Sequence, residues 1–138
     1  MDMEFNRTPT SGCILVKASG RVRAEAQTPG MIREEALNTG QLWTGIARTA
    51  PGNLSGWHHH GDWDTVAYVL SGAVRLECGP SGRTILYAEL GDFLFIPRAE
   101  IHRESNPTSE EQRLVIVRSG HGPVVIAADA PENDAPQE

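Results

Sequence analysis

The chain has 138 residues, 39% of them hydrophobic, which is enough for one domain of ordinary size with its own core. A formal net charge of −6 and a pI of about 5.3 argue against the basic surface that nucleic acid binding needs. No apolar run approaches the roughly 18 residues of a membrane span, and the polar start of the chain does not resemble a secretion signal. We therefore expect a cytoplasmic protein that binds neither nucleic acid nor a membrane.

The sequence predicts three regions in chain order. Residues 1–12 are expected to form a flexible N-terminus, residues 13–127 a single domain, and residues 128–138 a disordered acidic tail. Within the domain, clusters of Gly, Pro, Asn and Ser separate short apolar or alternating runs. These runs cover residues 13–17, 41–48, 64–70, 73–78, 83–89, 92–97, 101–105, 113–119 and 123–127. Many short strands at such spacing predict an all-β sandwich or barrel.

Residues 30–39 leave two interpretations open. Pro29 and Gly40 are suitable start and stop signals for a short helix, but the apolar residues between them follow a helical period only loosely. A short helix and an irregular strand are therefore both possible. Arg33, Glu34 and Glu35 would reach the mouth of a barrel if the segment folds across it; otherwise they form a solvated face, which we favour.

Three consecutive histidines lie at residues 58–60. In an extended segment, side chains alternate between faces, so His58 and His60 share one face and His59 lies on the other. A His-x-His pair on a strand can bind one metal ion, because neutral imidazole is a common metal ligand. The pair alone is a weak signal, since most such pairs are surface or hydrogen-bonded histidines.

The wider spacing resembles the two signatures of the cupin superfamily. Residues 52–72 hold a glycine, five residues, the His-x-His pair and a closing glycine, and residues 91–106 follow the pattern G-x5-P-x-G-x2-H-x3-N, with Ala99 at the second glycine. The resemblance covers about residues 41–119. It implies a double-stranded β-helix, or jelly-roll barrel, in which His58, His60 and His102 meet in one mouth of the barrel. It also implies one divalent transition metal ion, which would be Fe, Mn, Ni or Zn.

The chain departs from the first signature at Thr65, where the family usually has a glutamate ligand. Either the site has three histidines and open positions, or a bulge near Trp63 turns Asp64 inward as a fourth ligand and candidate catalytic base. We favour three histidines, because re-aiming the strand without a bulge would be costly. A three-histidine set resembles that of thiol dioxygenases, diketone-cleaving cupins and small polyketide cyclases. The second departure, Ala99, disfavours a positive φ at that position.

Several side chains are candidates for lining a substrate pocket: Trp43, Thr65, Tyr68, Phe93 and Phe95. For the aromatic residues, core packing is the commoner alternative. Phe93 and Phe95 alternate with Leu94 and Ile96, so only one of these pairs can face the interior. Glu104 shares a face with His102 and could orient an imidazole from outside the metal.

These features predict a metal-dependent cupin enzyme that acts on a small organic substrate. The reaction would be an O2-dependent cleavage or oxidation, or a Lewis-acid isomerisation or cyclisation. The alternative is a non-catalytic cupin that binds a metal or small ligand as a sensor or binding module. We also expect a homodimer, with residues 13–17 as an exposed edge strand that pairs with a second copy.

Overall fold

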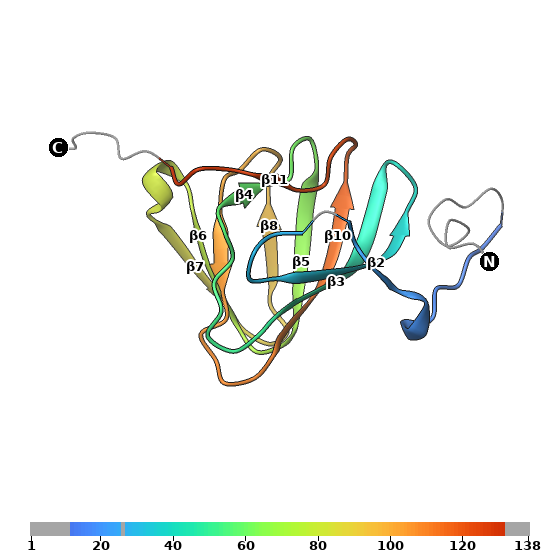
Figure 1. The fold of residues 1–138 in the computed structure, drawn as a ribbon, viewed down its shortest axis with the longest axis horizontal. Coiled ribbons are helices and arrows are strands. Elements are labelled where there is room, and N and C mark those ends of the chain that lie inside the picture. The colour runs from blue at the N-terminus through green and yellow to red at the C-terminus, as the bar shows by residue number, and fades with distance from the viewer. Residues whose placement is uncertain (1–11, 26, 132–138) are drawn as a thin grey trace.

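The structure, a computed structural model, describes residues 12–25 and 27–131. Nearly all of its regular structure is β-strand (Figure 1). The strands are β1 (Val22–Arg23), β2 (Ile32–Asn38), β3 (Leu42–Thr49), β4 (His58–His59), β5 (Asp64–Ser71), β6 (Val74–Cys78), β7 (Thr84–Ala88), β8 (Phe93–Ile96), β9 (Arg103–Ser105), β10 (Gln112–Ser119) and β11 (Ile126–Ala127). Two short 3-10 helices, η2 (Ala18–Gly20) and η3 (Pro80–Gly82), complete the described elements. The all-β prediction is confirmed.

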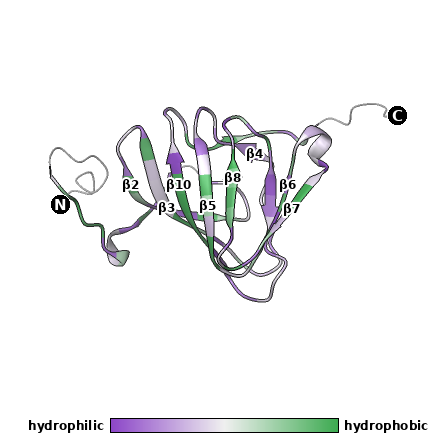
Figure 2. Ribbon diagram, turned by 180° about the vertical axis from the view of Figure 1, so that it is seen from behind, coloured by the Kyte–Doolittle hydropathy of each residue, from purple (hydrophilic) through white to green (hydrophobic). Residues whose placement is uncertain are grey.

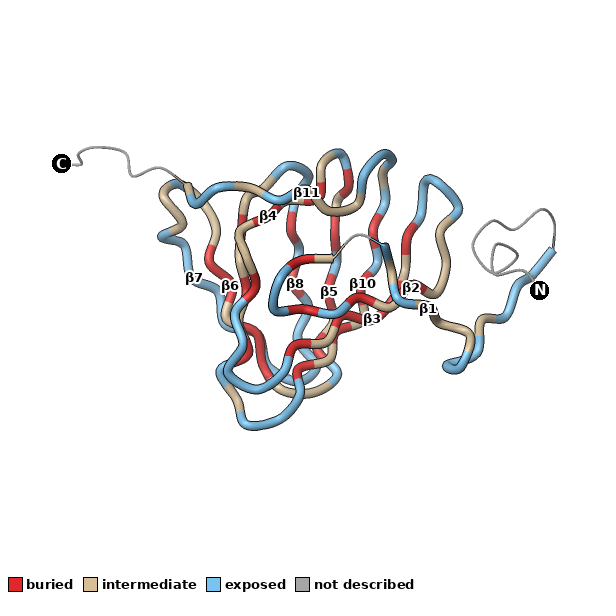
Figure 3. The backbone as a smooth tube through the Cα atoms, in the orientation of Figure 1, coloured by how far each residue is buried: buried red, intermediate tan, exposed pale blue. Residues whose placement is uncertain are grey.

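The strands form two larger antiparallel sheets that share one core. The first has the order β1-β2-β3-β10-β5-β8, the second has the order β7-β6-β9, and a short pair joins β4 to β11. Inward-facing side chains from both larger sheets belong to the same buried cluster, including Trp43 on β3, Leu76 on β6, Leu94 on β8 and Leu114 on β10. The buried positions alternate along β10, because successive side chains of a strand point to opposite faces (Figure 3).

Residues 30–39 form a strand rather than a helix. β2 pairs with β3 from Ile32 to Asn38, with one irregularity between Glu35 and Leu37. The inward-facing positions of β2 include Arg33 and Glu35, which are both buried, so the expectation of a solvated face is wrong for these two residues. Their polarity hid the alternating pattern, because periodicity is recognised by apolar residues on the buried face.

Residues 13–17 do not form the expected edge strand. They have no regular structure, and the Leu15 side chain is 76% exposed. Residues 1–11 of the expected flexible N-terminus and residues 132–138 of the expected acidic tail lie outside the described residues. Among the described residues, no helix is long and apolar enough to span a membrane.

Asn106, the last residue of the second signature, holds a buried turn together. Its amide nitrogen donates to the carbonyl oxygens of Thr49 and Glu110, at 3.0 and 2.6 Å. Its amide oxygen accepts hydrogen bonds from the backbone N–H and the hydroxyl of Thr108, at 3.0 and 2.7 Å. Asn106 is fully buried, so these backbone groups depend on this side chain rather than on water.

We predict that Asn106→Ala lowers the free energy of unfolding by about 2 kcal/mol, because it leaves buried backbone groups without a partner. The measurement is urea unfolding followed by circular dichroism. Asn53→Ala, at an exposed asparagine in the same region, is the matched control and should change stability by less than about 0.5 kcal/mol. Equal effects of the two substitutions would contradict this role for Asn106.

Candidate metal centre

The structure brings together His58, His60 and His102, as the spacing predicts. Their ligand atoms lie within 4.8 Å of one another, and all three side chains are buried. The backbones of His58 and His102 form a reciprocal pair of hydrogen bonds, each 2.9 Å long, which joins the first signature to the second. His59 stays outside the cluster, and its Nδ1 accepts a hydrogen bond from the N–H of Gly61 at 3.0 Å.

Backbone carbonyl groups fix the orientation of all three imidazole rings. The Nδ1 atoms of His58, His60 and His102 each lie 2.8 Å from a carbonyl oxygen, and the three carbonyls belong to Gly56, Val124 and Glu100. A carbonyl oxygen can only accept a hydrogen bond, so each Nδ1 carries the proton and donates it. In the neutral ring, each Nε2 therefore carries a lone pair, as a metal ligand requires, and at His58 this lone pair faces Nη2 of Arg33 at 3.3 Å.

The environment favours the neutral form of His58 and His60. Burial, together with the charges of His102 and Arg33, lowers the pKa of His58 to about 3, and Glu104 opposes this effect. Burial, followed by the charge of Arg118, lowers the pKa of His60 well below its usual value. Neutral imidazoles do not need to lose a proton before they bind a metal ion.

Glu104 supplies a carboxylate to the same cluster. Its Oε2 lies 3.5 Å from Nε2 of His102 and 3.8 Å from Nε2 of His58. Burial would raise the pKa of Glu104, but the neighbouring His102, His58 and Arg33 lower it to about 2, which favours the ionised carboxylate. Two ligands about 2.1 Å from one ion are separated by roughly 3.0 to 3.4 Å, so Glu104 lies close to a coordinating position.

The place of Glu104 differs from the expected one. We expected a residue that orients an imidazole from outside, but its carboxylate faces the Nε2 atoms and not the Nδ1 atoms. The signal in the sequence was the shared face of His102 and Glu104, two residues apart.

Asp64 is not turned toward the histidines. Its carboxylate accepts hydrogen bonds from the backbone N–H of Arg98 at 2.9 Å and from the Arg98 guanidinium at 3.2 Å, and these bonds lower its pKa. The register of β5 against β10 runs without a shift from Asp64 to Val69, so no bulge re-aims the strand there. The interpretation of Asp64 as an inward fourth ligand is therefore wrong.

Two arginines lie beside the histidine cluster. Nη2 of Arg33 is 3.3 Å from Nε2 of His58, and its Nη1 donates to the hydroxyl of Thr28 at 2.7 Å. Nε of Arg118 donates to the hydroxyl of Thr65 at 3.1 Å, and its guanidinium carbon lies 4.9 Å from the centre of the Trp43 ring. Burial lowers the pKa of Arg33 to about 10 and lowers the pKa of Arg118 as well.

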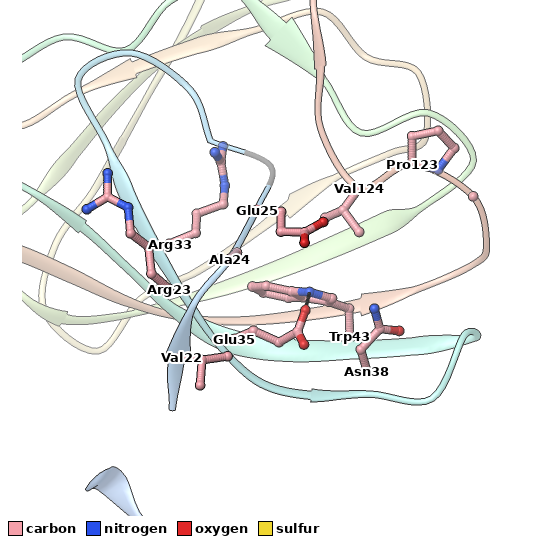
Figure 4. A pocket seen from close by; sticks show the side chains of 11 residues that line it. Val22, Arg23, Ala24, Glu25, Arg33, Glu35, Asn38, Trp43, Pro123 and Val124 are labelled. Carbon is pink, nitrogen blue, oxygen red and sulfur yellow. Dashed lines mark hydrogen bonds between the residues drawn. The ribbon is translucent and has the colours of Figure 1, made fainter. Parts of the chain in front are cut away.

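A cavity of about 470 Å³ opens next to this cluster (Figure 4). Its wall contains Arg33, which contacts His58, and Val124, whose carbonyl oxygen orients His60. The remaining lining residues are Val22, Arg23, Ala24, Glu25, Glu35, Asn38, Trp43, Gly122 and Pro123. The cavity is large enough for a small molecule, and Arg33 and Val124 connect its wall to the histidines.

The expected pocket residues divide between the two faces of the sheet. Trp43 lines the cavity, and Thr65 is buried beside Arg118. Phe93 and Phe95 are 71% and 58% exposed on the outer face, and Tyr68 stacks on Phe93 there. The expectation that these three aromatic residues line the pocket is wrong, because Leu94 and Ile96 occupy the inward positions of β8.

Ala99 also departs from expectation. It adopts a φ of 63°, although alanine disfavours this left-handed region. The turn is held in place by a hydrogen bond from the N–H of Glu100 to the carbonyl of Pro97 at 3.3 Å. The carbonyl of Glu100 is the group that orients His102, so the backbone conformation here serves the cluster.

The donor set fits a divalent first-row metal ion. Three imidazole nitrogens within 4.8 Å of one another suit Fe, Mn, Ni or Zn. His58, His60 and His102 would hold such an ion through Nε2, with Glu104 beside them.

Residues 45–118 match the cupin domain family. The match covers more than half of the chain, which therefore belongs to the cupin family. No curated protein sequence matches the chain.

The fold is similar to several solved structures. An uncharacterized conserved protein with a double-stranded beta-helix domain from Klebsiella pneumoniae subsp. pneumoniae MGH 78578 shares 19% identity at a TM-score of 0.68, over 86% of this chain and 99% of that chain. KdgF from Halomonas sp. shares 17% identity at a TM-score of 0.64, over 79% of this chain and 96% of that chain. The S161A mutant of the oxalate decarboxylase OxdC from Bacillus subtilis shares 17% identity at a TM-score of 0.63, over 76% of this chain and 29% of that chain. These similarities confirm the predicted double-stranded β-helix.

We predict that His58→Ala, His60→Ala and His102→Ala each weaken metal binding by at least about 100-fold, because each removes an Nε2 ligand. His59→Ala is the control within the same histidine run and should leave binding unchanged. The measurements are calorimetric titration with Mn(II) and Zn(II) and elemental analysis after dialysis, on variants whose folding is checked by circular dichroism. Stoichiometric metal in any of the first three variants would contradict the assignment.

Proposed function

We propose that the protein is a metal-dependent enzyme that acts on a small organic substrate. The observation that supports this proposal most directly is the cluster of three buried histidines, whose ligand atoms lie within 4.8 Å of one another, together with a cavity of about 470 Å³ whose wall contains Arg33, a neighbour of His58. Sites that combine a concave space with convergent polar groups and perturbed pKa values are typical of catalysis.

A bound divalent ion would supply Lewis-acid chemistry at a substrate oxygen, or O2 chemistry if it is iron. The chain's own residues hold and surround it. Glu104 serves as a fourth ligand rather than as a proton acceptor, because a carboxylate with a pKa of about 2 is a weak base at neutral pH. Trp43 offers an apolar surface to the substrate from the cavity wall.

The proposed activity can be tested on the protein loaded separately with Fe(II), Mn(II), Ni(II) and Zn(II). We expect the iron form to take up O2 with a diketone, thiol or catechol. With another metal, we expect an isomerised or cyclised product, which mass spectrometry would detect. Glu104→Gln should weaken metal binding by about 10- to 100-fold and lower turnover, since it removes the charge of the fourth ligand. Glu110→Gln, at an exposed glutamate, is the control.

The non-catalytic alternative predicts a different outcome from the same experiment. A sensor or binding module would hold the metal and a small ligand but would convert none of these substrates. Metal binding without turnover in all four forms would therefore favour the binding module over the enzyme. The expected location in the cytoplasm stays a prediction.

We further propose that the protein is a homodimer, paired through the outer face of the larger sheet. Figure 2 shows hydrophobic segments along β5 and β8. Side chains that are apolar and exposed on this outer face include Val66, Phe93, Phe95 and Val117. A contiguous exposed apolar patch of this kind is typical of an interaction surface. We propose this face as the dimer interface instead of the edge strand expected at residues 13–17, because those residues do not form a strand.

We predict a mass near twice 15.0 kDa by light scattering, and a mass near 15.0 kDa for the double variant Phe93→Ser with Phe95→Ser. The physical reason is the loss of apolar surface buried between the copies. Leu15→Ser is the control, because it changes an exposed apolar residue in the originally expected edge. A monomeric native protein, or dissociation by Leu15→Ser alone, would contradict this interface.

A further inference from the structure

We propose that the cavity beside the histidines binds its small molecule through a carboxylate group, with Arg33 as the direct contact and Arg118 as a second positive charge. This inference names the substrate class for the proposed enzyme and rests on that function for its catalytic meaning. Its physical basis is the burial, hydrogen bonding and charge of the two arginines.

Arg33 and Arg118 lie against different histidines of the cluster. Arg33 reaches Nε2 of His58 at 3.3 Å and lines the cavity (Figure 4). Arg118 affects the charge of His60 more than any other residue does, and it stacks on Trp43, which also lines the cavity. A molecule in the cavity therefore meets one guanidinium directly and lies close to the second.

Both guanidinium groups are buried and incompletely hydrogen-bonded. Arg33 and Arg118 are 1% and 2% exposed. Within residues 12–25 and 27–131, no acceptor is found for Nε of Arg33 or for Nη1 of Arg118. Arg48 and Arg113 also have an Nε without an acceptor, but these two side chains are only partly buried. Buried donors normally have a partner, so a missing acceptor at two fully buried cations indicates an anion.

The charges around the cavity lead to the same conclusion. The charge of Glu104 acts on both arginines, and its carboxylate lies beside His58 and His102. Glu35 lies on the cavity wall and accepts a hydrogen bond from the Trp43 indole at 2.8 Å. Arg23 and Glu25 are exposed at the rim, where water screens them.

A divalent ion held by the histidines adds two further positive charges, so the cations outweigh Glu104 and Glu35. An anionic ligand reduces this excess of positive charge, whereas a neutral ligand leaves it unchanged.

The number of available donors favours a carboxylate over a phosphate. Nη1 of Arg33 is occupied by Thr28, and Nη2 contacts His58, which leaves Nε without a partner. A carboxylate needs few donors and carries one charge. A phosphate monoester has three acceptor oxygens and nearly two charges, and it requires more donors than Arg33 presents.

The test is calorimetric titration of the full chain, both metal-free after EDTA treatment and loaded with Mn(II). The probes are pyruvate and benzoate, their neutral amides, and phenyl phosphate. We expect both forms to bind at least one of the carboxylates and neither amide. In the metal-free form, Arg33→Gln should weaken carboxylate binding by about tenfold or more, and Arg118→Gln by about threefold or more.

Arg113→Gln is the matched control, because Arg113 lies on the same strand as Arg118 but on its other face. It should leave carboxylate binding unchanged. If Arg33→Gln does not fold, Arg118→Gln and the comparison of each carboxylate with its neutral amide on the native protein supply the same evidence.

Three results would overturn the inference: amides that bind as tightly as carboxylates, no binding of either carboxylate, or phenyl phosphate as the preferred probe. Carboxylate binding without turnover would contradict the proposed enzymatic function but support the carboxylate site. Turnover of a neutral substrate without carboxylate binding would support the enzymatic function but contradict the carboxylate site.

Discussion

The hydrogen bonds from three imidazole Nδ1 atoms to backbone carbonyls are the constraint on which the rest of the site depends. Each is 2.8 Å long, and together they direct three Nε2 atoms into one buried space. The carbonyls belong to Gly56 in the irregular segment before β4, to Glu100 just before His102, and to Val124 in the segment between β10 and β11. The cluster therefore forms only when distant parts of the barrel close around it. Metal affinity and correct closure of the fold are in this way coupled.

The polar interior has an energetic consequence for the fold. Arg33, Arg118 and Glu104 occupy inward positions that apolar residues could fill, and burying such charges is costly unless they are paired. Glu104 can offset only part of this cost, since its single charge acts on both arginines. Buried groups that lower the stability of the fold are common at functional sites, because activity there requires groups that are not the most stabilising choice. A bound metal ion and anion would stabilise the folded chain through mass action.

Spacing in the sequence predicted the fold and the three histidines, because glycines, the His-x-His pair and strand alternation are local features. Positions that depend on tertiary pairing were harder to predict. Phe93 and Phe95 have the same apolar character as Leu94 and Ile96, and only the second sheet decides which pair is covered. Arg33 was missed because a buried cation looks like a surface residue in a sequence. Residues 13–17 are apolar, but apolar character alone does not supply a strand partner.

Thr65, which stands where the family pattern has a glutamate, connects the metal ligands to the arginines. The family pattern implies a carboxylate at this position, where Thr65 instead accepts a hydrogen bond from Nε of Arg118. A glutamate in the same place would neutralise Arg118 directly and would leave it no charge to offer a ligand. With the carboxylate supplied by Glu104 on β9, the cluster keeps an anionic group, and Arg118 stays without a dedicated carboxylate partner at position 65. The loss of one acidic ligand and the gain of positive charge beside the cavity are therefore the same structural change.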